Sequence, residues 1–320
     1  MNQSNRNPEG YWHGDDLFWN QSLVFHIYDS KNKVAGHIRI GLLENLKESN
    51  NWLIFFIDGK PLYLRNNQNL PYTSKRIDNG VEVAGIRVTS LEPLKTVRIE
   101  FSSRNFSLNL LAEELHPMVD CIALSDDEEG TLSKEMTHVH MEGTCRFTGS
   151  ITYDGGKRID IDGDGFRDVS VGPRNWDSVL YYGMTWPVFS NGVAFSGIHA
   201  ISADGRNSFM KMLHDGKQWV RVKRFEDRNA YAEDGVTIRS LHWKFWDTND
   251  RMWEYTGKSL YSWPYSCDTF MQVQQMMEYR LSDGTMGYGM AEQGFRLDSL
   301  RPGPAYDRRM ANTLLLQPKK

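Results

Sequence analysis

Cysteine is scarce in this chain, which has Cys121, Cys145 and Cys267 among its 320 residues. An odd number of cysteines with no closely spaced pair disfavours both a disulfide scaffold and a four-thiolate zinc site. Thiols that stay reduced are typical of a reducing compartment. The sequence therefore predicts a cytoplasmic protein.

Long hydrophobic runs are also missing. The longest strongly apolar stretch, residues 52–57, is far shorter than the roughly 20 residues that a membrane-spanning helix needs. The first residues, MNQSNRNP, lack the apolar core of a signal peptide. We therefore expect neither a transmembrane segment nor a secretory leader.

The chain also has no excess of positive charge. It contains 37 Lys and Arg and 41 Asp and Glu, which gives a net charge of −4. Binding to nucleic acid depends on a basic surface that displaces counterions from phosphates. This balance argues against a nucleic-acid partner. The sequence leaves the oligomeric state open, with a homodimer among the options.

Turn and strand signals, in contrast, are plentiful. Asp-Gly or Asn-Gly pairs, which suit the tight turns of hairpins, occur at 58–59, 79–80, 154–155, 191–192, 204–205, 215–216, 234–235 and 283–284. Alternating or β-branched stretches flank these turns, at 22–28, 37–42, 52–57, 81–88, 97–101, 193–201, 208–213, 219–225, 236–245 and 269–281. Long helical crossovers, which a parallel sheet would require, are not found.

These signals predict an all-β protein made of two consecutive antiparallel barrels or sandwiches. The expected N-terminal unit covers residues 1–178 and the expected C-terminal unit covers 179–320. A barrel of about eight strands can hold one small ligand. Short helices are expected at 43–48, 110–115 and 306–311, and the charged stretch 125–134 is expected to be a solvated loop.

Aromatic residues make up 12% of the chain, with ten Trp, fourteen Tyr and fifteen Phe. Aromatic side chains pack well on β-sheets, which is the simpler interpretation. The alternative is a cavity lined by aromatic rings.

Residues 138–176 are the most informative stretch, and two metal interpretations apply to it. Asp160, Asp162 and Asp164 with the following glycine match the opening of a calcium loop, but Val171 stands where a bidentate Glu belongs. His138 and His140 share a strand face with Glu142, a spacing that suits a mononuclear metal. No second histidine cluster matches it, so a metal site is not favoured.

The same stretch carries a resemblance. Residues 165–176, GFRDVSVGPRNW, look like the signature of a superfamily of paired lipocalin-like domains that includes the bacterial carotenoid hydratases (hydroxyneurosporene synthases). Residues 140–143, 147–149 and 287–292 resemble further segments of that superfamily, as do the first strands from 14 to 41. Where its pattern has His and Trp, thought to belong to the hydratase active site, this chain has Val169 and Val171.

The resemblance implies cofactor-independent acid chemistry on an alkene. A buried carboxylic acid would donate a proton to the double bond, and aromatic faces would hold the resulting cation. The candidate catalytic residues are Asp168, favoured because it lies in the signature, with Glu142, Glu292, Arg167 and His140. The candidate substrate-binding residues are Trp176, Trp186, Tyr181, Tyr182, Phe195, His199 and Trp243.

Each candidate also has a structural interpretation. Arg167 and Asp168 would form a buried ion pair, Glu142 would pair with Arg146 or Arg158, and Glu292 would pair with Arg296. The aromatic residues and His199 would belong to the core.

Three function classes therefore compete. The first is a hydratase, cyclase or isomerase of a lipophilic terpenoid-, polyene- or steroid-like substrate, without cofactor or metal. The second is a non-catalytic lipid or isoprenoid carrier, which the valines at 169 and 171 favour. The third is a structural or partner-binding protein with a filled core.

Overall fold

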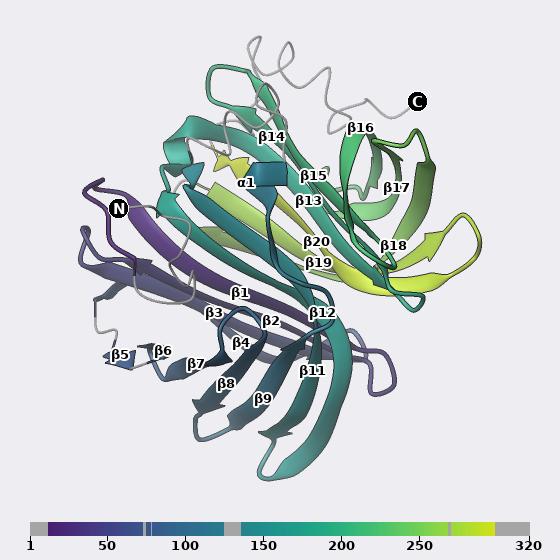
Figure 1. The fold of residues 1–320 in the computed structure, drawn as a ribbon. Helices are drawn as coiled ribbons and strands as arrows, with labels where there is room; N and C mark the ends of the chain where they lie inside the picture. The colour runs from purple at the N-terminus through teal and green to yellow at the C-terminus, as the bar shows by residue number, and fades with distance from the viewer. Residues whose placement is uncertain (1–11, 73–74, 78, 125–135, 268–269, 298–320) are drawn as a thin grey trace. The chain divides into compact units, whose positions relative to one another are not determined.

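The computed structural model describes residues 12–72, 75–77, 79–124, 136–267 and 270–297. The chain forms two compact units (Figure 1). Unit 1 comprises Met1–Cys121 with Glu135–Arg174, and unit 2 comprises Ile122–Lys134 with Asn175–Lys320. Each unit is described by itself below.

Unit 1 is a curled antiparallel sheet that stays open, in the order β4-β3-β2-β1-β12-β11-β9-β8-β7-β6-β5, with β10 paired to β11 (Figure 1). Its strands are β1 (Trp19–Asp29), β2 (Val34–Leu43), β3 (Glu48–Ile57), β4 (Lys60–Pro71), β5 (Lys75–Ile77), β6 (Gly80–Val83), β7 (Ile86–Glu92), β8 (Thr96–Ser102), β9 (Phe106–Glu114), β10 (Val119–Asp120), β11 (Val139–Tyr153) and β12 (Lys157–Pro173). One short helix, α1 (Cys121–Leu124), follows β10.

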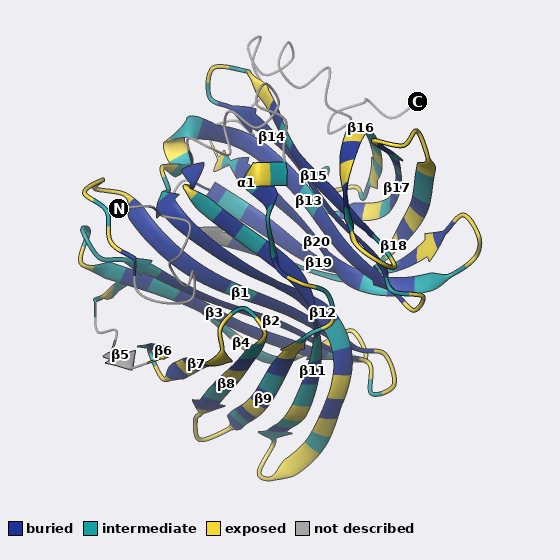
Figure 2. Ribbon diagram, in the orientation of Figure 1, coloured by how far each residue is buried: buried dark blue, intermediate teal, exposed yellow. Residues whose placement is uncertain are grey.

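The two faces of this sheet differ along its length. In β8 and β9, buried apolar residues alternate with more exposed ones, so one face forms the core and the other faces solvent (Figure 2). In β1, β2 and the C-terminal part of β12, nearly every residue is buried (Figure 2). The polar side chains of that stretch are therefore buried on the face opposite the apolar core, and this face carries the candidate site.

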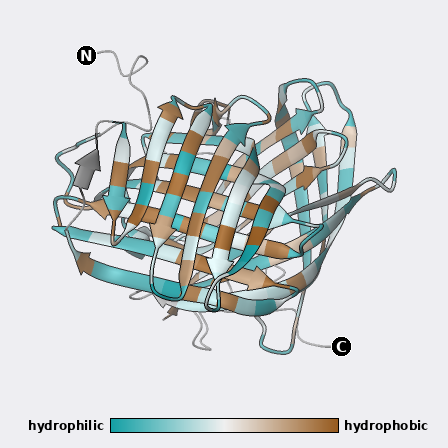
Figure 3. Cartoon of the chain, turned by 90° about the horizontal axis from the view of Figure 1, so that it is seen from below, coloured by the Kyte–Doolittle hydropathy of each residue, from teal (hydrophilic) through white to brown (hydrophobic). Residues whose placement is uncertain are grey.

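Unit 2 is a closed antiparallel barrel of eight strands in sequence order. They are β13 (Val179–Phe189), β14 (Val193–Ser202), β15 (Asn207–Asp215), β16 (Trp219–Tyr231), β17 (Ile238–Asp247), β18 (Met252–Cys267), β19 (Phe270–Leu281) and β20 (Met286–Arg296). A 3-10 turn, η2 (Trp176–Ser178), precedes β13. Hydrophobic and hydrophilic residues alternate along many strands (Figure 3), as expected when one face of a sheet lines a core.

The barrel interior is filled largely by aromatic rings. Phe195, for example, lies with its ring centroid 4.9 Å from those of Phe245 and Tyr255. All three side chains are fully buried. The aromatic content of the sequence thus serves core packing first, as the simpler interpretation predicted.

The predicted all-β class with few short helices is confirmed, and so is the hairpin over residues 154–156. Two predicted helices are wrong: residues 44–47 form a turn between β2 and β3, and residues 110–114 belong to β9. The predicted strand 81–88 is interrupted by a turn at Ala84-Gly85, where both residues have positive φ. The expected helix at 306–311 and the loop at 125–134 lie outside the described residues.

Within the described part of the chain, no helix is both long and apolar enough to cross a membrane.

Candidate functional site

The site predicted from the signature centres on β11 and β12, which pair from Val139 with Val171 to Tyr153 with Lys157. Glu142 lies directly opposite Asp168, and His140 lies opposite Ser170. Side chains two residues apart on a strand share a face, so His140, Glu142, Asp168 and Ser170 all project from the same side of the sheet. The backbone just before β11 lies very close to Gly172. Only a glycine fits there, because its φ is +149° and a Cβ would lie 2.4 Å from the backbone nitrogen of His138.

Three of the candidate residues form one buried cluster. The Nε2 atom of His140 contacts the Oδ2 atom of Asp168 and lies 3.2 Å from the Oε1 atom of Glu142. The side chain of Glu142 is 0% exposed, whereas those of His140 and Asp168 are 10% and 12% exposed. Asp168 is therefore the carboxyl of the cluster with the most access to a ligand.

The electrostatics of the cluster favour a proton on His140. Burial alone would lower its pKa, but the charge of Asp168 and the hydrogen bonds to Asp168 and Glu142 outweigh burial and raise it to about 10. Cys121 also contacts the cluster by a hydrogen bond to Glu142. Burial, followed by the charges of Glu142 and Asp168, raises the pKa of that thiol well above its usual value.

A second polar group continues the same face of unit 1. The Oγ atoms of Ser22 on β1 and Ser170 on β12 lie 3.2 Å apart, and the Arg174 guanidinium donates a hydrogen bond to Ser170. Further along β1 and β2, the rings of His26 and His37 stack on each other. His26 lies opposite Phe166, two residues before Asp168, so the histidine pair belongs to this face.

The cluster is also where a metal ion could bind among the described residues. One donor atom each from His140, Glu142 and Asp168 lie within 4.8 Å of one another. In the structure, the His140 and Asp168 atoms contact each other directly, as a pair sharing a proton does. His138 does not take part, because its ring packs edge-on against Trp19, with centroids 5.3 Å apart.

Arg167 projects from the opposite face of β12. Its Nε donates a hydrogen bond to the Sδ of Met118 at 2.8 Å, and the side chain is buried. Val169 and Val171 also lie on that face, Val169 in the main core of unit 1 and Val171 against Trp12 and Trp19. The two positions where the superfamily pattern has His and Trp thus point away from the Asp168 cluster in this chain.

The calcium interpretation does not fit the structure. Asp160, Asp162 and Asp164 lie within the continuous strand β12 rather than in a loop between helices. Arg146 forms ion pairs with Asp162 and Asp164, and Arg158 forms one with Asp160. Both arginines named as structural partners of Glu142 are therefore engaged by these aspartates.

In unit 2, Glu292 belongs to a separate hydrogen-bonded cluster on the outer face of the barrel. The hydroxyl of Tyr182 and the side-chain amide of Gln274 both donate to its carboxylate. Gln272 donates to the Tyr182 hydroxyl, and Gln274 also donates to Tyr265. Glu292 is therefore held by neutral donors, while Arg296 donates to the backbone carbonyl of Asp177.

Aromatic rings adjoin this cluster. Trp176 lies 5.8 Å from Tyr182 and 5.1 Å from Phe270, measured between ring centroids, and Tyr182 and Phe270 are nearly parallel. Trp186 lies on the same outer face, two strand positions beyond Met184, and is buried. The remaining candidates lie inside the barrel: Phe195 and Trp243 in its aromatic core, and Tyr181 and His199 nearer one end.

The predicted site residues thus fall into three places rather than one: the His140–Glu142–Asp168 cluster, the Glu292 cluster and the barrel interior. Sequence reasoning missed Cys121, His26, His37, Gln272 and Gln274. The two glutamines could have been noticed, because they are polar residues spaced by two in an otherwise largely apolar strand. Cys121 could not, since it reaches Glu142 only through the pairing of β10 with β11.

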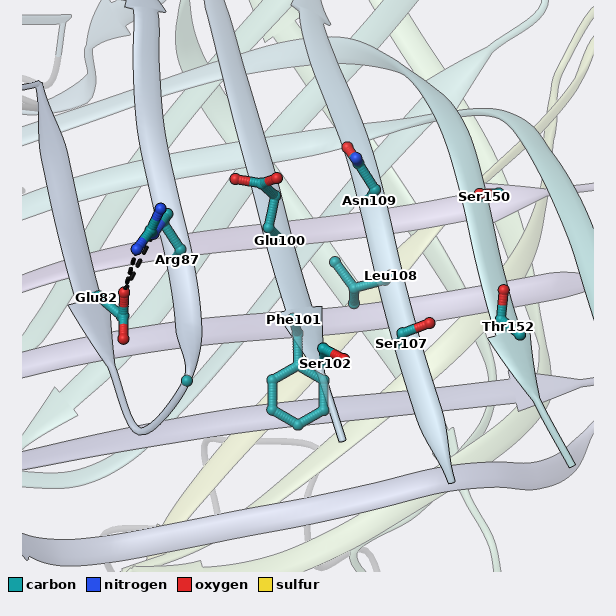
Figure 4. Close-up of a pocket in the computed structure, with 11 residues that line it drawn as sticks. Glu82, Arg87, Glu100, Phe101, Ser102, Ser107, Leu108, Asn109, Ser150 and Thr152 are labelled. Carbon is teal, nitrogen blue, oxygen red and sulfur yellow. Dashed lines mark hydrogen bonds and ion pairs between the residues drawn. The ribbon is translucent and has the colours of Figure 1, made fainter. Parts of the chain in front are cut away.

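Two surface grooves lie apart from these clusters. One, of about 440 Å³, crosses the outer face of β6–β9 and β11 and is lined by an ion pair of Glu82 with Arg87 and by small polar side chains such as Ser107 and Thr152 (Figure 4). The other, of about 620 Å³, crosses β16–β19 and includes Arg228 and Arg280. Neither groove is lined by a predicted catalytic residue.

Solved structures share this fold at low sequence identity. CghA, crystallised with Sch210972, matches with a TM-score of 0.65 and 12% identity over 88% of this chain and 89% of CghA. An AttH-like protein from Nitrosomonas europaea matches with a TM-score of 0.62 and 10% identity over 90% of this chain and 96% of that protein. Kievitone hydratase from Nectria haematococca matches with a TM-score of 0.59 and 11% identity, covering 86% and 88%.

These matches confirm the fold that the resemblance of the signature implies. Comparison with curated proteins gives no match. A family profile described as "Domain of unknown function (DUF7064)" matches residues 11–295, which span both units. This chain therefore belongs to the DUF7064 family.

Proposed function

We propose that this protein is a cofactor-independent hydratase, cyclase or isomerase that protonates an alkene of a lipophilic substrate. The observation that carries the proposal is the buried cluster in which His140 contacts both Asp168 and Glu142. Asp168 is the proton donor, because it is the more exposed of the two carboxyls. His140 and Glu142 are positioning residues, since they act through Asp168.

The proton count of the cluster suits this chemistry. An imidazolium beside a carboxylate holds the same single proton as an imidazole beside a carboxylic acid, so Asp168 can reach its acid form by one proton shift from His140. Donation of that proton makes a C–H bond, and the other alkene carbon becomes a cation. The cluster then carries two buried negative charges, from Asp168 and Glu142, which stabilise a cation at low local dielectric.

The cation has three balanced outcomes. Water adds and returns a proton to the Asp168 carboxylate, which is hydration. A second double bond attacks to form a ring and a new cation, and a C–H beside that cation loses its proton to the Asp168 carboxylate, which is cyclisation. A neighbouring C–H loses its proton to the carboxylate, which moves the double bond. The kievitone hydratase relative and the CghA relative crystallised with a small molecule support this class of function.

The proposal is tested by incubating the protein in D₂O with alkenes such as geraniol, farnesol and squalene, followed by mass spectrometry of the recovered compounds. Protonation of a double bond places deuterium on carbon whichever outcome follows. We expect labelling of at least one alkene by the wild type and loss of labelling in Asp168→Asn. Asp164→Asn is the matched control, because Asp164 lies on the same strand, is 44% exposed and pairs with Arg146.

Recovery of every alkene bound but unlabelled would replace this function with that of a carrier, the second class that the sequence leaves open. Labelling that survives in Asp168→Asn would remove Asp168 from the mechanism. A cytoplasmic location belongs to the same proposal and is supported by the buried thiols of Cys121 and Cys145.

A further inference from the structure

The closed barrel of unit 2 has one seam at which neighbouring strands part. β15 and β16 pair only from Met212 to His214 on one side and from Trp219 to Arg221 on the other, although both strands extend well beyond these residues (Figure 1). Along the parted stretch, the amine of Lys211 crosses to the backbone carbonyl of Lys223 at 3.3 Å. The barrel wall therefore lacks a continuous ladder of backbone hydrogen bonds here.

Ring-bearing side chains flank the parted stretch. Phe209 on β15 and Phe225 on β16 face each other edge-on, with centroids 6.0 Å apart, and both are only partly buried. Behind them, Phe225 contacts the buried Trp243, with centroids 4.7 Å apart. An apolar path thus leads from the seam into the barrel core.

A histidine and an aspartate lie beside this path. His199 stacks on Phe209 at 4.5 Å between centroids, and its Nε2 pairs with the Oδ1 of Asn207 at 3.0 Å. Its Nδ1 lies 3.7 Å from the Oδ2 of Asp227, whose side chain is 26% exposed. The path is therefore polar and negatively charged at its entrance.

Deeper in the barrel, a chain of hydrogen bonds ends in an unsatisfied acceptor. The hydroxyls of Tyr181 and Tyr231 are hydrogen-bonded to each other, and the side-chain amide of Gln293 donates to Tyr231 at 3.0 Å. The Oε1 atom of Gln293 accepts no hydrogen bond from the described residues, although the residue is 0% exposed. A buried acceptor without a donor destabilises the folded protein, so the site lacks a donor that a ligand can supply.

We propose that this end of the barrel is a second ligand site, which takes a neutral, flat, lipophilic molecule bearing a hydroxyl group and entering through the seam between β15 and β16. The hydroxyl donates to Gln293 Oε1, and the apolar body packs among Phe209, Phe225 and Trp243. The site is independent of the acid chemistry proposed at Asp168.

The charge around the path decides against other ligand classes. Asp227 repels carboxylates such as fatty acids. The amine of Lys211 lies 5.9 Å from the ring centroid of Phe209 and donates a hydrogen bond to the backbone carbonyl of Lys223, whereas the charge of Asp227 reaches the hydroxyls of Tyr181 and Tyr231. A hydrocarbon without a hydroxyl would leave Gln293 Oε1 unsatisfied. A phenol or alcohol meets both conditions.

The test compares three molecules of matched size, 1-naphthol, naphthalene and 1-naphthoate, by calorimetric or fluorescence titration of the full-length protein. We expect 1-naphthol to bind about tenfold or more tightly than naphthalene, the effect of one satisfied buried hydrogen bond, and 1-naphthoate to bind weakest. Equal affinity of 1-naphthol and naphthalene in the wild type would overturn the proposal without any variant.

Two substitutions locate the binding. Gln293→Met keeps the side-chain length but removes the acceptor, so the preference for 1-naphthol over naphthalene should fall to about one. Asp227→Asn removes the negative charge at the entrance and should improve 1-naphthoate binding. Asp168→Asn and Glu292→Gln, outside the barrel interior, should leave 1-naphthol binding unchanged. Loss of binding in either of these two variants, with binding kept in Gln293→Met, would assign the ligand elsewhere and reject the site.

Discussion

His26 and His37 stack on each other across β1 and β2, with ring centroids 4.6 Å apart, an interplanar angle of 16° and Nδ1 atoms 2.9 Å apart. Both rings are buried, and Trp52 continues the stack beyond His37. A contact between two Nδ1 atoms needs one N–H and one lone pair, so the two rings cannot both be protonated. Burial lowers the pKa of His26 to about 3 and that of His37 well below its ordinary value.

This pair predicts acid sensitivity. In the unfolded chain both histidines titrate near 6.5, whereas in the folded chain they resist protonation. The unfolded state therefore binds more protons below pH 6.5, and the free energy of unfolding falls as the pH drops from 6.5 towards 3. Urea denaturation at a series of pH values should show this slope.

The substitution His37→Phe should make that slope shallower, because it removes one of the two buried titrating rings but keeps an aromatic ring in the stack. Trp52→Phe is the control, since it trims the same stack without removing a titratable group. Equal slopes in the wild type and in His37→Phe would contradict the assignment.

His140 predicts the opposite dependence at high pH. Its folded-state pKa of about 10 lies above the unfolded value of 6.5, despite burial, because Asp168 and Glu142 favour the imidazolium. The stabilisation is fully present below pH 6.5 and is lost as the pH rises towards 10. Protonation of His26 and His37 in the unfolded chain lowers the stability below pH 6.5, and loss of the His140 proton lowers it above that pH. The free energy of unfolding of the wild type should therefore be highest near pH 6.5.

Replacing His140 by Gln should remove the alkaline slope and destabilise the protein at pH 7 by about 3–5 kcal/mol, the usual cost of leaving a buried partner charge uncompensated. Denaturation of the variant at pH 7 and pH 9.5 measures both effects. A slope that persists in His140→Gln would show that another group titrates there.

Most of the architecture was readable from local signals. Asp-Gly and Asn-Gly turns mark several hairpins, and Asp58-Gly59 shows why: both residues have positive φ, which these types tolerate. The predicted helix at 110–115 failed because Leu108, Leu110 and Ala112 alternate inward along β9, where pairing with β8 and β11 decides the conformation.

The cluster was predictable in part. Strand alternation places His140 and Glu142 on one face from sequence alone, and the signature drew attention to Asp168. That these three meet depends on the β11–β12 register, in which Glu142 lies opposite Asp168. The His26–His37 pair and the parted seam at β15 depend on pairings between strands that no local pattern encodes.

The Tyr182 hydroxyl should matter for stability because it donates to Glu292 and accepts from Gln272. Tyr182→Phe removes both hydrogen bonds in a buried setting and should lower the free energy of unfolding by about 1–3 kcal/mol. Tyr288→Phe is the matched control, since its hydroxyl donates to Glu278 over a long 3.5 Å and the residue is partly exposed. Equal losses in the two variants would show that ring packing, not hydrogen bonding, is measured.

Phe195 should behave as a core residue. Its ring is fully buried among Phe245, Tyr255 and Phe189, so Phe195→Ala should destabilise unit 2 by about 3–5 kcal/mol through lost contacts and the cavity that remains. Thermal denaturation measures the loss. If the variant kept wild-type stability but no longer bound lipophilic ligands, Phe195 would line a ligand cavity instead.

The proposed chemistry has its own pH dependence, because alkene protonation requires the proton that His140 and Asp168 share. Deuterium labelling should stay constant from neutral pH upwards and decline as the pD approaches the His140 pKa of about 10, where that proton is lost. His140→Gln has no imidazole to hold this proton. Its residual labelling should therefore decline at a lower pD than that of the wild type, as expected for a carboxylic acid without the imidazole. Glu142→Gln keeps the shared proton but removes one of the two negative charges near the cation, so it should slow labelling. The dependence of labelling on pD should remain that of the wild type. Labelling that declines identically in the wild type and His140→Gln would mean that the imidazole does not supply the proton.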